Sequence, residues 1–464
     1  MRILVVSYYF RPSLTPRAFR WESIASVWAS AGHEVDVVTS AITGVQPWES
    51  TAGVEVHRTG SKWLDRLRNR FRPSEVGSRP DDRAANGRGQ VDSRDNTVGR
   101  SGLRQAAQRV YDLTWKQVMW PDFSSMWYFS AVTRAQQLVS DRKYDALVSV
   151  SLPFTGHLVG LRIKSRCPSL RWLVDIGDPF CWGGNERSLN NPRLYRRLNV
   201  AAERRVFELA DHVAVTNSRT CERYGDMFGP AAAEKIRVIG PVIGPKVLDS
   251  SPQPEPFSLP ADRINIVFAG ALVSSVRRPK EFLAWMDRVA CEWNKQGQPK
   301  LLFHLIGSAG DFDSLVRDAG ISHADVRYHG LLPQEQALAA LRRAHCVLNC
   351  GNTTDYQLPS KVYEYMATGK PILNVVFNPR DPAIDALNEY PQAIHCHAGE
   401  EPTVELLEFL RGSISQTSTP DSGMHSAAVR DHLVPNIASK YAELLGASPI
   451  EANQGLHNLE NTCP

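Results

Sequence analysis

Apolar and polar positions along the chain follow a pattern typical of strands that alternate with helices. A β-rich run covers residues 2–9, and a second predicted strand covers 34–39. Between them, apolar residues recur at helical spacing, at Trp21, Ile24, Trp28 and Ala31. Gly32 then ends the predicted helix. Further strands are predicted at 146–151, 171–177 and 212–217. Alternating elements of this kind predict a parallel sheet covered on both faces, which is a doubly wound α/β domain.

A second series of the same kind follows a Pro- and Ser-rich segment at 242–263, which we interpret as a linker. Its predicted strands are 264–270, 301–307, 326–330, 346–350 and 371–376. We therefore expect two doubly wound, Rossmann-like domains, 1–241 and 264–424, facing a cleft. A terminal helix is expected at 425–446, with a return to the first domain as one option, and 447–464 is expected to fray.

The amino-acid composition indicates which broad class of protein the chain belongs to. The chain has 464 residues, of which 42% are hydrophobic and 22% charged, as in a globular protein of more than one domain. Its eight cysteines form no disulfide framework, so we expect reduced thiols. We find no signal peptide and no apolar run long enough to span a bilayer, and we expect a cytoplasmic protein.

Charge is distributed unevenly between the two halves. Residues 1–245 contain 35 Lys+Arg and 24 Asp+Glu, or +11, and the remainder contains 18 and 25, or −7. A basic front half favours an anionic partner such as a membrane surface, although a solvated surface without a partner fits equally well. No nucleic-acid recognition motif accompanies the charge, and we expect no nucleic-acid partner.

Two segments before residue 102 stand apart from the strand and helix pattern. Residues 74–101 have almost no large apolar side chains, which predicts a disordered insertion. Residues 62–71 form a basic amphipathic pattern. Such a helix can lie on the inner face of the plasma membrane as a peripheral contact, or it can pack on its own domain.

The stretch "LPSKVYEYMATGKPIL", residues 358–373, predicts a short helix at the carboxyl end of the second sheet. Ser360 is a plausible cap and Gly369 the expected stop. The positive helix end and Lys361 together suit a diphosphate, and Glu364 could accept hydrogen bonds from sugar hydroxyls. The alternative is an ordinary ion pair between Lys361 and Glu364 on the helix surface.

This stretch resembles the nucleotide-sugar-binding segment of the retaining glycosyltransferases of family 4, which have the two-domain GT-B fold. The resemblance extends over most of the chain, through "MRILVVSYYFRP", "AGHEVDVVT", "FAGAL", "HLIGSAGD" and "YHGLLP". It implies that Glu364 holds the nucleotide ribose and that Gly330 and Leu331 lie beside the base. Gly270, Gly307, Ser360 and Lys361 are further donor-binding candidates. For the diphosphate the resemblance leaves Arg277, Arg278 and Lys280 as candidates.

One position departs from the family pattern. The family often has a Glu eight positions before the ribose Glu, where this chain has Tyr356. "TTDYQLPSK" thus resembles a subgroup that acts on cell-surface polysaccharide precursors, and the departure leaves the donor sugar open.

The first domain offers candidates for the other substrate. The loop at 10–19 has no G-x-G-x-x-G, which argues against a dinucleotide oxidoreductase. Arg17 could instead meet donor phosphate or acceptor, or be an exposed capping-turn arginine. Asp178, in an Asp-Pro turn, could orient the acceptor or stabilise an oxocarbenium-like transition state. The alternative is that it is an ordinary turn residue with only a structural role. His157 is a second catalytic candidate on the acceptor side.

His395 and His397 lie on one face of a predicted strand but lack a third ligand at metal spacing, so we expect no metal and no cofactor there. The resemblance likewise implies metal-independent chemistry. We expect a hexosyltransferase that moves a sugar, with retention, from a UDP- or GDP-linked donor to a saccharide or polyprenyl-linked acceptor in cell-envelope polysaccharide biosynthesis. The alternatives are a nucleotide-sugar 2-epimerase and a non-catalytic scaffold that binds nucleotide sugar.

Overall fold

The computed structural model describes residues 1–60, 118–183, 190, 192–244, 247, 255–415 and 427–449, except for residues 14, 43 and 52. The predicted amphipathic helix at 62–71, the predicted insertion at 74–101 and most of the predicted tail lie outside these residues. The described chain divides into two compact units. Unit 1 contains the residues up to Gly240 and those from Val434 onward, and unit 2 contains Pro241–Leu433.

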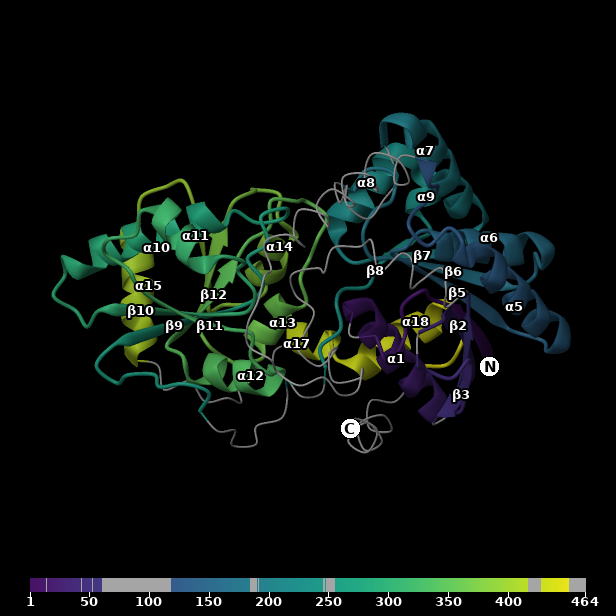
Figure 1. The fold of residues 1–464 in the computed structure, drawn as a ribbon, viewed down its shortest axis with the longest axis horizontal. Coiled ribbons are helices and arrows are strands. Elements are labelled where there is room, and N and C mark those ends of the chain that lie inside the picture. The colour runs from purple at the N-terminus through teal and green to yellow at the C-terminus, as the bar shows by residue number, and fades with distance from the viewer. Residues whose placement is uncertain are drawn as a thin grey trace, which may run out of the picture. The chain divides into compact units, whose positions relative to one another are not determined.

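Unit 1 is built on an eight-stranded sheet in the order β3-β4-β2-β1-β5-β6-β7-β8 (Figure 1). Its strands are β1 (Arg2–Val6), β2 (Glu34–Ser40), β3 (Trp48–Thr51), β4 (Val54–Thr59), β5 (Ala146–Ser151), β6 (Arg171–Ile176), β7 (His212–Val215) and β8 (Ile236–Val238). Neighbouring strands are parallel, apart from the antiparallel pair β3 and β4. The strands that follow β1 in sequence, β2 to β4, lie on one side of it. The later strands, β5 to β8, lie on the other side. The strand order therefore reverses between β1 and β5, where doubly wound sheets bind ligands.

Helices cover both faces of this sheet. They are α1 (Pro16–Ser30), α5 (Trp127–Asp141), α6 (Thr155–Arg166), α7 (Pro192–Leu209), α8 (Ser218–Phe228), α9 (Pro230–Ala233) and α18 (Val434–Leu444). Helix α1 begins as its sequence predicts, because Thr15 accepts a hydrogen bond from the amide of Ala18 and Pro16 occupies the first helical position. None of the helices described in either unit is long and apolar enough to cross a membrane.

The terminal helix returns to unit 1, which confirms that option. The indole nitrogen of Trp28 in α1 donates to the carbonyl of Ala438, and the rings of Trp21 and Tyr441 pack together. The single helix predicted for 425–446 is wrong, however, because the chain forms α17 (Ala427–Asp431) in unit 2 and then α18 in unit 1. Leu433 pairs with Ile243 between the two helices. Pro435 is tolerated only in a first helical turn, so a new helix begins there.

Unit 2 is built on a six-stranded parallel sheet in the order β11-β10-β9-β12-β13-β14. Its strands are β9 (Ile264–Ala269), β10 (Leu301–Ile306), β11 (Asp325–Gly330), β12 (Cys346–Cys350), β13 (Ile372–Val376) and β14 (Ala393–His397). The strand order reverses between β9 and β12. This pair of strands therefore marks the expected ligand-binding edge of unit 2.

Both faces of the second sheet are also covered. The helices are α10 (Pro279–Asn294), α11 (Phe312–Ala319), α12 (Gln334–Arg343), α13 (Lys361–Met366), α14 (Pro382–Asn388), α15 (Val404–Ser415) and α17. Alternate residues of β9 enter two separate cores: Ile266 and Phe268 pack on one face, and Val267 and Ala269 on the other. Each unit is thus a doubly wound α/β domain, as the sequence predicts.

The segment interpreted as a linker packs into unit 2. Val247 is buried in its core, and the ring of Phe257 stacks on those of His304 and His329. Proline and serine content alone does not reveal these contacts, because the apolar residues of the segment follow no helix or strand period.

Candidate functional site

Three glycines lie together at the carboxyl ends of β9, β10 and β11. The amide of Gly270 donates to the carbonyl of Ile306, and that of Gly307 donates to the carbonyl of Gly330. Gly307 has φ +128°, and a Cβ atom there would lie 2.0 Å from the carbonyl oxygen of Gly270. The strand ends approach so closely that only glycine fits at position 307. The structure therefore brings three of the predicted donor-side residues to one edge of the sheet.

Arg277 is distinguished from the other two diphosphate candidates by burial. It is 9% exposed, its Nη1 donates to the carbonyl of Ala271 at 2.6 Å, and its guanidinium lies over the ring of Phe268. Arg278 and Lys280 are exposed, and Arg278 pairs with Glu281 one helical turn away. An ion pair of this exposed kind contributes little stability. Of the three, Arg277 is the cation held inside the fold at the carboxyl end of β9.

Asn352 and Asp381, which the sequence analysis did not single out, organise the loop after β12. The side-chain oxygen of Asn352 accepts from Nε of Arg277 at 3.4 Å, and its amide nitrogen donates to the carbonyl of Gln357. Asp381 accepts from the backbone amides of Asn352 and Ala383. Burial raises the pKa of Asp381 to about 6 even though these hydrogen bonds and the charge of Arg277 act to lower it. Arg277 therefore bridges β9 and β12, on the two sides of the strand-order reversal.

The sequence contains a pattern from which the capping role of Asp381 could have been predicted. Asp followed by Pro382 at a helix start is a common capping pattern, and Asp381 is the N-cap of α14. The contact of Asp381 with the amide of Asn352 depends on the tertiary fold and could not be predicted from this pattern.

Helix α13 is shorter than expected and begins without the predicted cap. It covers six residues, and Ser360 has helical backbone angles and forms no side-chain capping bond, so its predicted capping role is wrong. The carbonyl of Ser360 instead accepts from the amides of Tyr363 and Glu364. Gly369 has φ +69° and ends the turn as predicted. So short a helix has a weak dipole, so the side chains carry most of the chemistry at this end.

Lys361 and Glu364 lie one turn apart on α13. Lys361 Nζ is 3.4 Å from Glu364 Oε2, so the surface ion pair considered as an alternative is present. Glu364 is nevertheless mostly covered, with 11% of its side chain exposed against 38% for Lys361. The hydroxyl of the neighbouring Tyr365 donates to the carbonyl of Ala269 in β9, and the charges of Arg277 and Glu364 both act on that phenol. Glu364 and Arg277 thus both lie close enough to buried Tyr365 for their charges to act on its hydroxyl.

The remaining donor-side candidates differ in exposure. Leu331 is 50% exposed and follows Gly330, which has φ +67°, at the end of β11. Tyr356, at the position where the family often has Glu, is 5% exposed. Asp355 beside it pairs with Arg380. Tyr356 is therefore part of the packed loop after β12.

In unit 1, Arg17 pairs with a buried carboxylate that the sequence analysis did not single out. Its Nη1 donates to Asp175 Oδ2 at 2.8 Å, and its guanidinium lies against Gly177, where a Cβ atom would come within 1.5 Å of Nη2. Asp175 also accepts from the indole of Trp21 and the hydroxyl of Tyr441. Burial alone would raise the pKa of Asp175, but the charges of Arg17 and Arg20 and these hydrogen bonds hold it below its usual value. Arg17 is therefore fixed at the carboxyl end of β6.

We expect Tyr441→Phe to destabilise unit 1 by about 1–3 kcal/mol, because it removes a donor to buried Asp175 and an acceptor for Arg20. Urea denaturation measures the change. Tyr195→Phe is the matched control, since its hydroxyl bonds to a carbonyl in an exposed setting, and it should cost less. Equal midpoints for wild type and Tyr441→Phe would contradict the role given to this network.

His157 is the other unit 1 candidate, and it is fully buried. The indole of Trp172 donates to Ser149 Oγ at 3.0 Å, and Ser149 Oγ lies 2.9 Å from His157 Nδ1. Burial lowers the pKa of His157 to about 3, so the ring is neutral at pH 7. Since Ser149 accepts from Trp172, its own proton can go to Nδ1, which places the ring proton on Nε2. Nε2 has no partner among the described residues, so His157 suits hydrogen-bond donation better than proton removal.

The other catalytic candidate, Asp178, is half-buried in the turn after β6. It follows Gly177, the residue against which Arg17 lies. Helix α6, which carries His157, packs over the reversal between β1 and β5: a Cβ atom on Gly156 would meet the carbonyls of Val150 and Val6. His157 is therefore carried on the helix at the strand-order reversal, and Arg17 and Asp178 lie at the end of the next strand, β6.

We expect stability to fall as the pH drops from 7 to 5. Burial lowers the pKa of His157 to about 3 and of His304 to about 4, below about 6.5 in an unfolded chain. Over that window the unfolded state binds more protons, and each histidine costs about 2 kcal/mol at pH 5. Asp381 opposes this effect, since a raised pKa favours the folded state at lower pH. NMR titration should show both rings neutral at pH 5; a midpoint near 6.5 for either would contradict the assignment.

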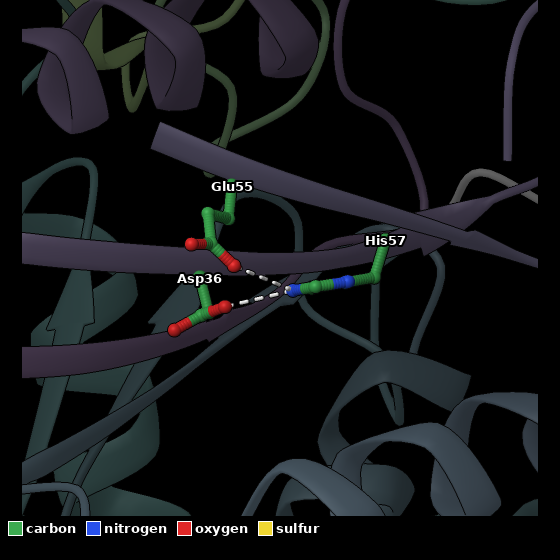
Figure 2. A group of neighbouring side chains, drawn as sticks. All are labelled: Asp36, Glu55 and His57. Carbon is green, nitrogen blue, oxygen red and sulfur yellow. Dashed lines mark hydrogen bonds and ion pairs between the residues drawn. The ribbon is translucent and has the colours of Figure 1, made fainter. Parts of the chain in front are cut away.

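Asp36, Glu55 and His57 in unit 1 form the one group of potential metal ligands found among the described residues, with ligand atoms within 4.8 Å of one another (Figure 2). Arg142 Nη1 lies 3.1 Å from Glu55 and 3.4 Å from Asp36. Arg134 donates to His57 Nδ1, which leaves the ring proton on Nε2, 2.7 Å from Asp36. A metal would need that nitrogen without its proton. These contacts fit an ion-pair network better than a metal centre.

His395 is engaged as well. Its Nδ1 contacts the side-chain amide of Asn374 and its Nε2 that of Asn388. His397, two residues further along β14, is exposed.

Two doubly wound domains of this kind define the GT-B fold of glycosyltransferases. Similar solved structures include sucrose-phosphate synthase from Thermosynechococcus elongatus, with 13% identity, 99% of this chain and 98% of that chain covered, and a TM-score of 0.54. A second is the E. coli structure described as trehalose-6-phosphate bound with UDP-2-fluoro glucose. It is 13% identical, the match covers 97% of this chain and 100% of that chain, and the TM-score is 0.57. A third is WaaG, a glycosyltransferase involved in lipopolysaccharide biosynthesis. It is 13% identical, the match covers 96% of this chain and 99% of that chain, and the TM-score is 0.50. At this identity, the likeness shows the fold.

Residues 18–241 match the family described as Glycosyl transferase 4-like domain, which covers most of unit 1. No curated protein matches the chain. The family match covers just under half of the chain, and the solved structures share the GT-B fold.

Proposed function

We propose that this protein moves a sugar from a nucleotide-sugar donor to a saccharide or polyprenyl-linked acceptor, with retention at the anomeric carbon, in the synthesis of a cell-envelope polysaccharide. The observation that carries the proposal is buried Arg277, whose guanidinium links β9 and β12 across the strand-order reversal of unit 2. A buried cation at this edge suits an anionic ligand.

The donor contacts follow from this placement. Arg277 holds the diphosphate, and Lys361, which lies 3.4 Å from Glu364, supplies a second positive charge on α13. Glu364 accepts hydrogen bonds from the ribose hydroxyls, and Gly330 and exposed Leu331 lie beside the base. Gly270 and Gly307 carry no side chain, so at these strand ends backbone faces the donor. The donor is a UDP- or GDP-linked hexose.

The acceptor side lies in unit 1. Arg17 and Asp178 flank Gly177 at the end of β6, and neutral His157 offers an N–H to a substrate oxygen. The acceptor hydroxyl oxygen bonds to the anomeric carbon as the bond from that carbon to the diphosphate oxygen breaks. The hydroxyl proton passes to a phosphate oxygen of the leaving group. This scheme needs no protein base, which agrees with the low pKa of His157.

In this proposal the guanidinium of Arg277 and the ammonium of Lys361 balance the charge of the leaving diphosphate, and the enzyme needs no metal. Addition of a chelator should then leave the rate unchanged.

The test incubates the protein with UDP- and GDP-linked sugars, with and without a polyprenyl-diphosphate-linked saccharide. We expect release of nucleoside diphosphate only when donor and acceptor are both present, and a product that keeps the donor's anomeric configuration. Isomerisation of the donor without an acceptor would point to a 2-epimerase, and binding without turnover to a non-catalytic scaffold. Either result would overturn the proposal.

A further inference from the structure

Large apolar side chains are exposed together on one face of unit 1. They come from the segment before α5, from α5 and from α7, and are Val118, Met126, Phe129, Leu194 and Leu198. Between 46% and 72% of each residue is exposed. We refer to these five residues, with Arg162, Arg196 and Arg197, as the α5–α7 face.

Contacts within unit 1 hold these elements together. Helix α6 packs against both α5 and α7, and the three helices lie beside one another in Figure 1. The hydroxyl of Tyr195 in α7 donates to the carbonyl of Val118, and the indole of Trp120 donates to Asn199. The segment that carries Val118 is therefore joined to α7, which carries Leu194 and Leu198.

A groove of about 740 Å³ lies on this part of unit 1. Its wall is formed by the segment 118–121, by Met126 and Phe129, and by Leu158 and Leu161 of α6. Arg162 lies at its edge. A monomeric soluble protein rarely leaves a large apolar patch uncovered, and such a patch marks an interaction site.

Arg162 lines the groove, and Arg196 and Arg197 line a second hollow along α7. Arg162 on α6 and Arg196 and Arg197 on α7 are all exposed. The stretches 118–129, 155–166 and 192–202 contain one acidic residue, Asp122, which is buried and bonded to Thr155. The exposed carboxylates of α5 and α7 lie at the far ends of these helices, at Asp141 and Glu208, and Glu208 pairs with Arg205. Apolar side chains next to an excess of arginine complement an anionic lipid surface.

We propose that the α5–α7 face docks on an anionic lipid bilayer. The apolar residues enter the boundary between headgroups and acyl chains, and the arginines contact lipid phosphates. A second copy of the chain is a poorer occupant, because two such basic faces would repel each other. Arg17, Asp178 and His157 do not line the groove, although Leu158, which does, follows His157 in α6. The proposal does not depend on the chemistry assigned to those three residues.

Sedimentation of the full chain with vesicles tests the proposal. We expect binding to vesicles of phosphatidylcholine with phosphatidylglycerol, much weaker binding to phosphatidylcholine alone, and a loss of binding at high salt. Arg196→Ala with Arg197→Ala should lower the partition coefficient about tenfold or more. Phe129→Asp with Leu194→Asp should lower it at least as much, since it removes the inserted side chains and adds like charge.

Matched changes in unit 2 are the controls. Arg317→Ala with Arg411→Ala removes the same charge, and Val404→Asp replaces an equally exposed apolar residue. Both control variants should bind like wild type. The proposal is overturned if wild type does not bind anionic vesicles, if it binds neutral ones equally well, or if the face variants bind like the controls. A dimer that the face variants dissociate, detected by light scattering, would also overturn it.

Discussion

Arg277→Ala should lower kcat/KM for the nucleotide-sugar donor by about 100- to 1,000-fold, the usual effect of losing a buried charge that stabilises a leaving group. Arg278→Ala, one residue away, should change it less than about threefold, because that side chain is exposed and pairs with Glu281. Donor kinetics of the two variants measure the difference. The adjacent arginine is a matched control for charge and for position in the loop.

Arg277 also holds the loop after β12 through Asn352, so its loss could act by disordering that loop. Calorimetric binding of a nucleoside diphosphate and of the matching nucleoside separates the two effects. Loss of a phosphate contact weakens the diphosphate far more than the nucleoside, whereas a disordered loop weakens both. Equal losses, or equal kinetics for the Arg277 and Arg278 variants, would contradict the assignment.

Glu364→Ala should weaken binding of the nucleoside diphosphate about 10- to 100-fold, because a mostly buried carboxylate would no longer accept hydrogen bonds from the ribose. The matching 2′,3′-dideoxynucleotide should lose little, since it lacks those hydroxyls. Fluorescence or calorimetric titration of both nucleotides checks this expectation.

Glu281→Ala removes an exposed carboxylate of the same unit and serves as the control. If Glu364 only pairs with Lys361, its replacement should affect the ribo- and dideoxynucleotide equally. That outcome would remove Glu364 from the donor site and leave the surface ion pair as its role.

Much of the fold follows from local sequence pattern. The runs at 146–151 and 346–350 are β5 and β12 with the predicted bounds, because short, mostly apolar runs of this length suit buried parallel strands. The antiparallel pair β3 and β4 was not predicted: Trp48–Thr51 is a short edge strand whose sequence carries no apolar alternation. Edge strands are weakly constrained by burial, so their pattern is faint.

The site was harder to predict from the sequence than the fold, because its residues are distinguished by tertiary contacts. Arg277, Arg278 and Lys280 are equivalent in sequence, and only packing against Phe268 and Ala271 distinguishes the first. Arg17 finds its partner Asp175 158 residues further along the chain. No local period or motif encodes a contact at that separation.

The most direct test of the account is a crystal structure of the protein with a bound UDP- or GDP-sugar. We predict that the diphosphate lies within hydrogen-bond distance of the Arg277 guanidinium and that the ribose hydroxyls contact Glu364. A nucleotide bound elsewhere, with Arg277 still covered by Phe268 and Asn352 and the Lys361–Glu364 pair intact, would contradict the account.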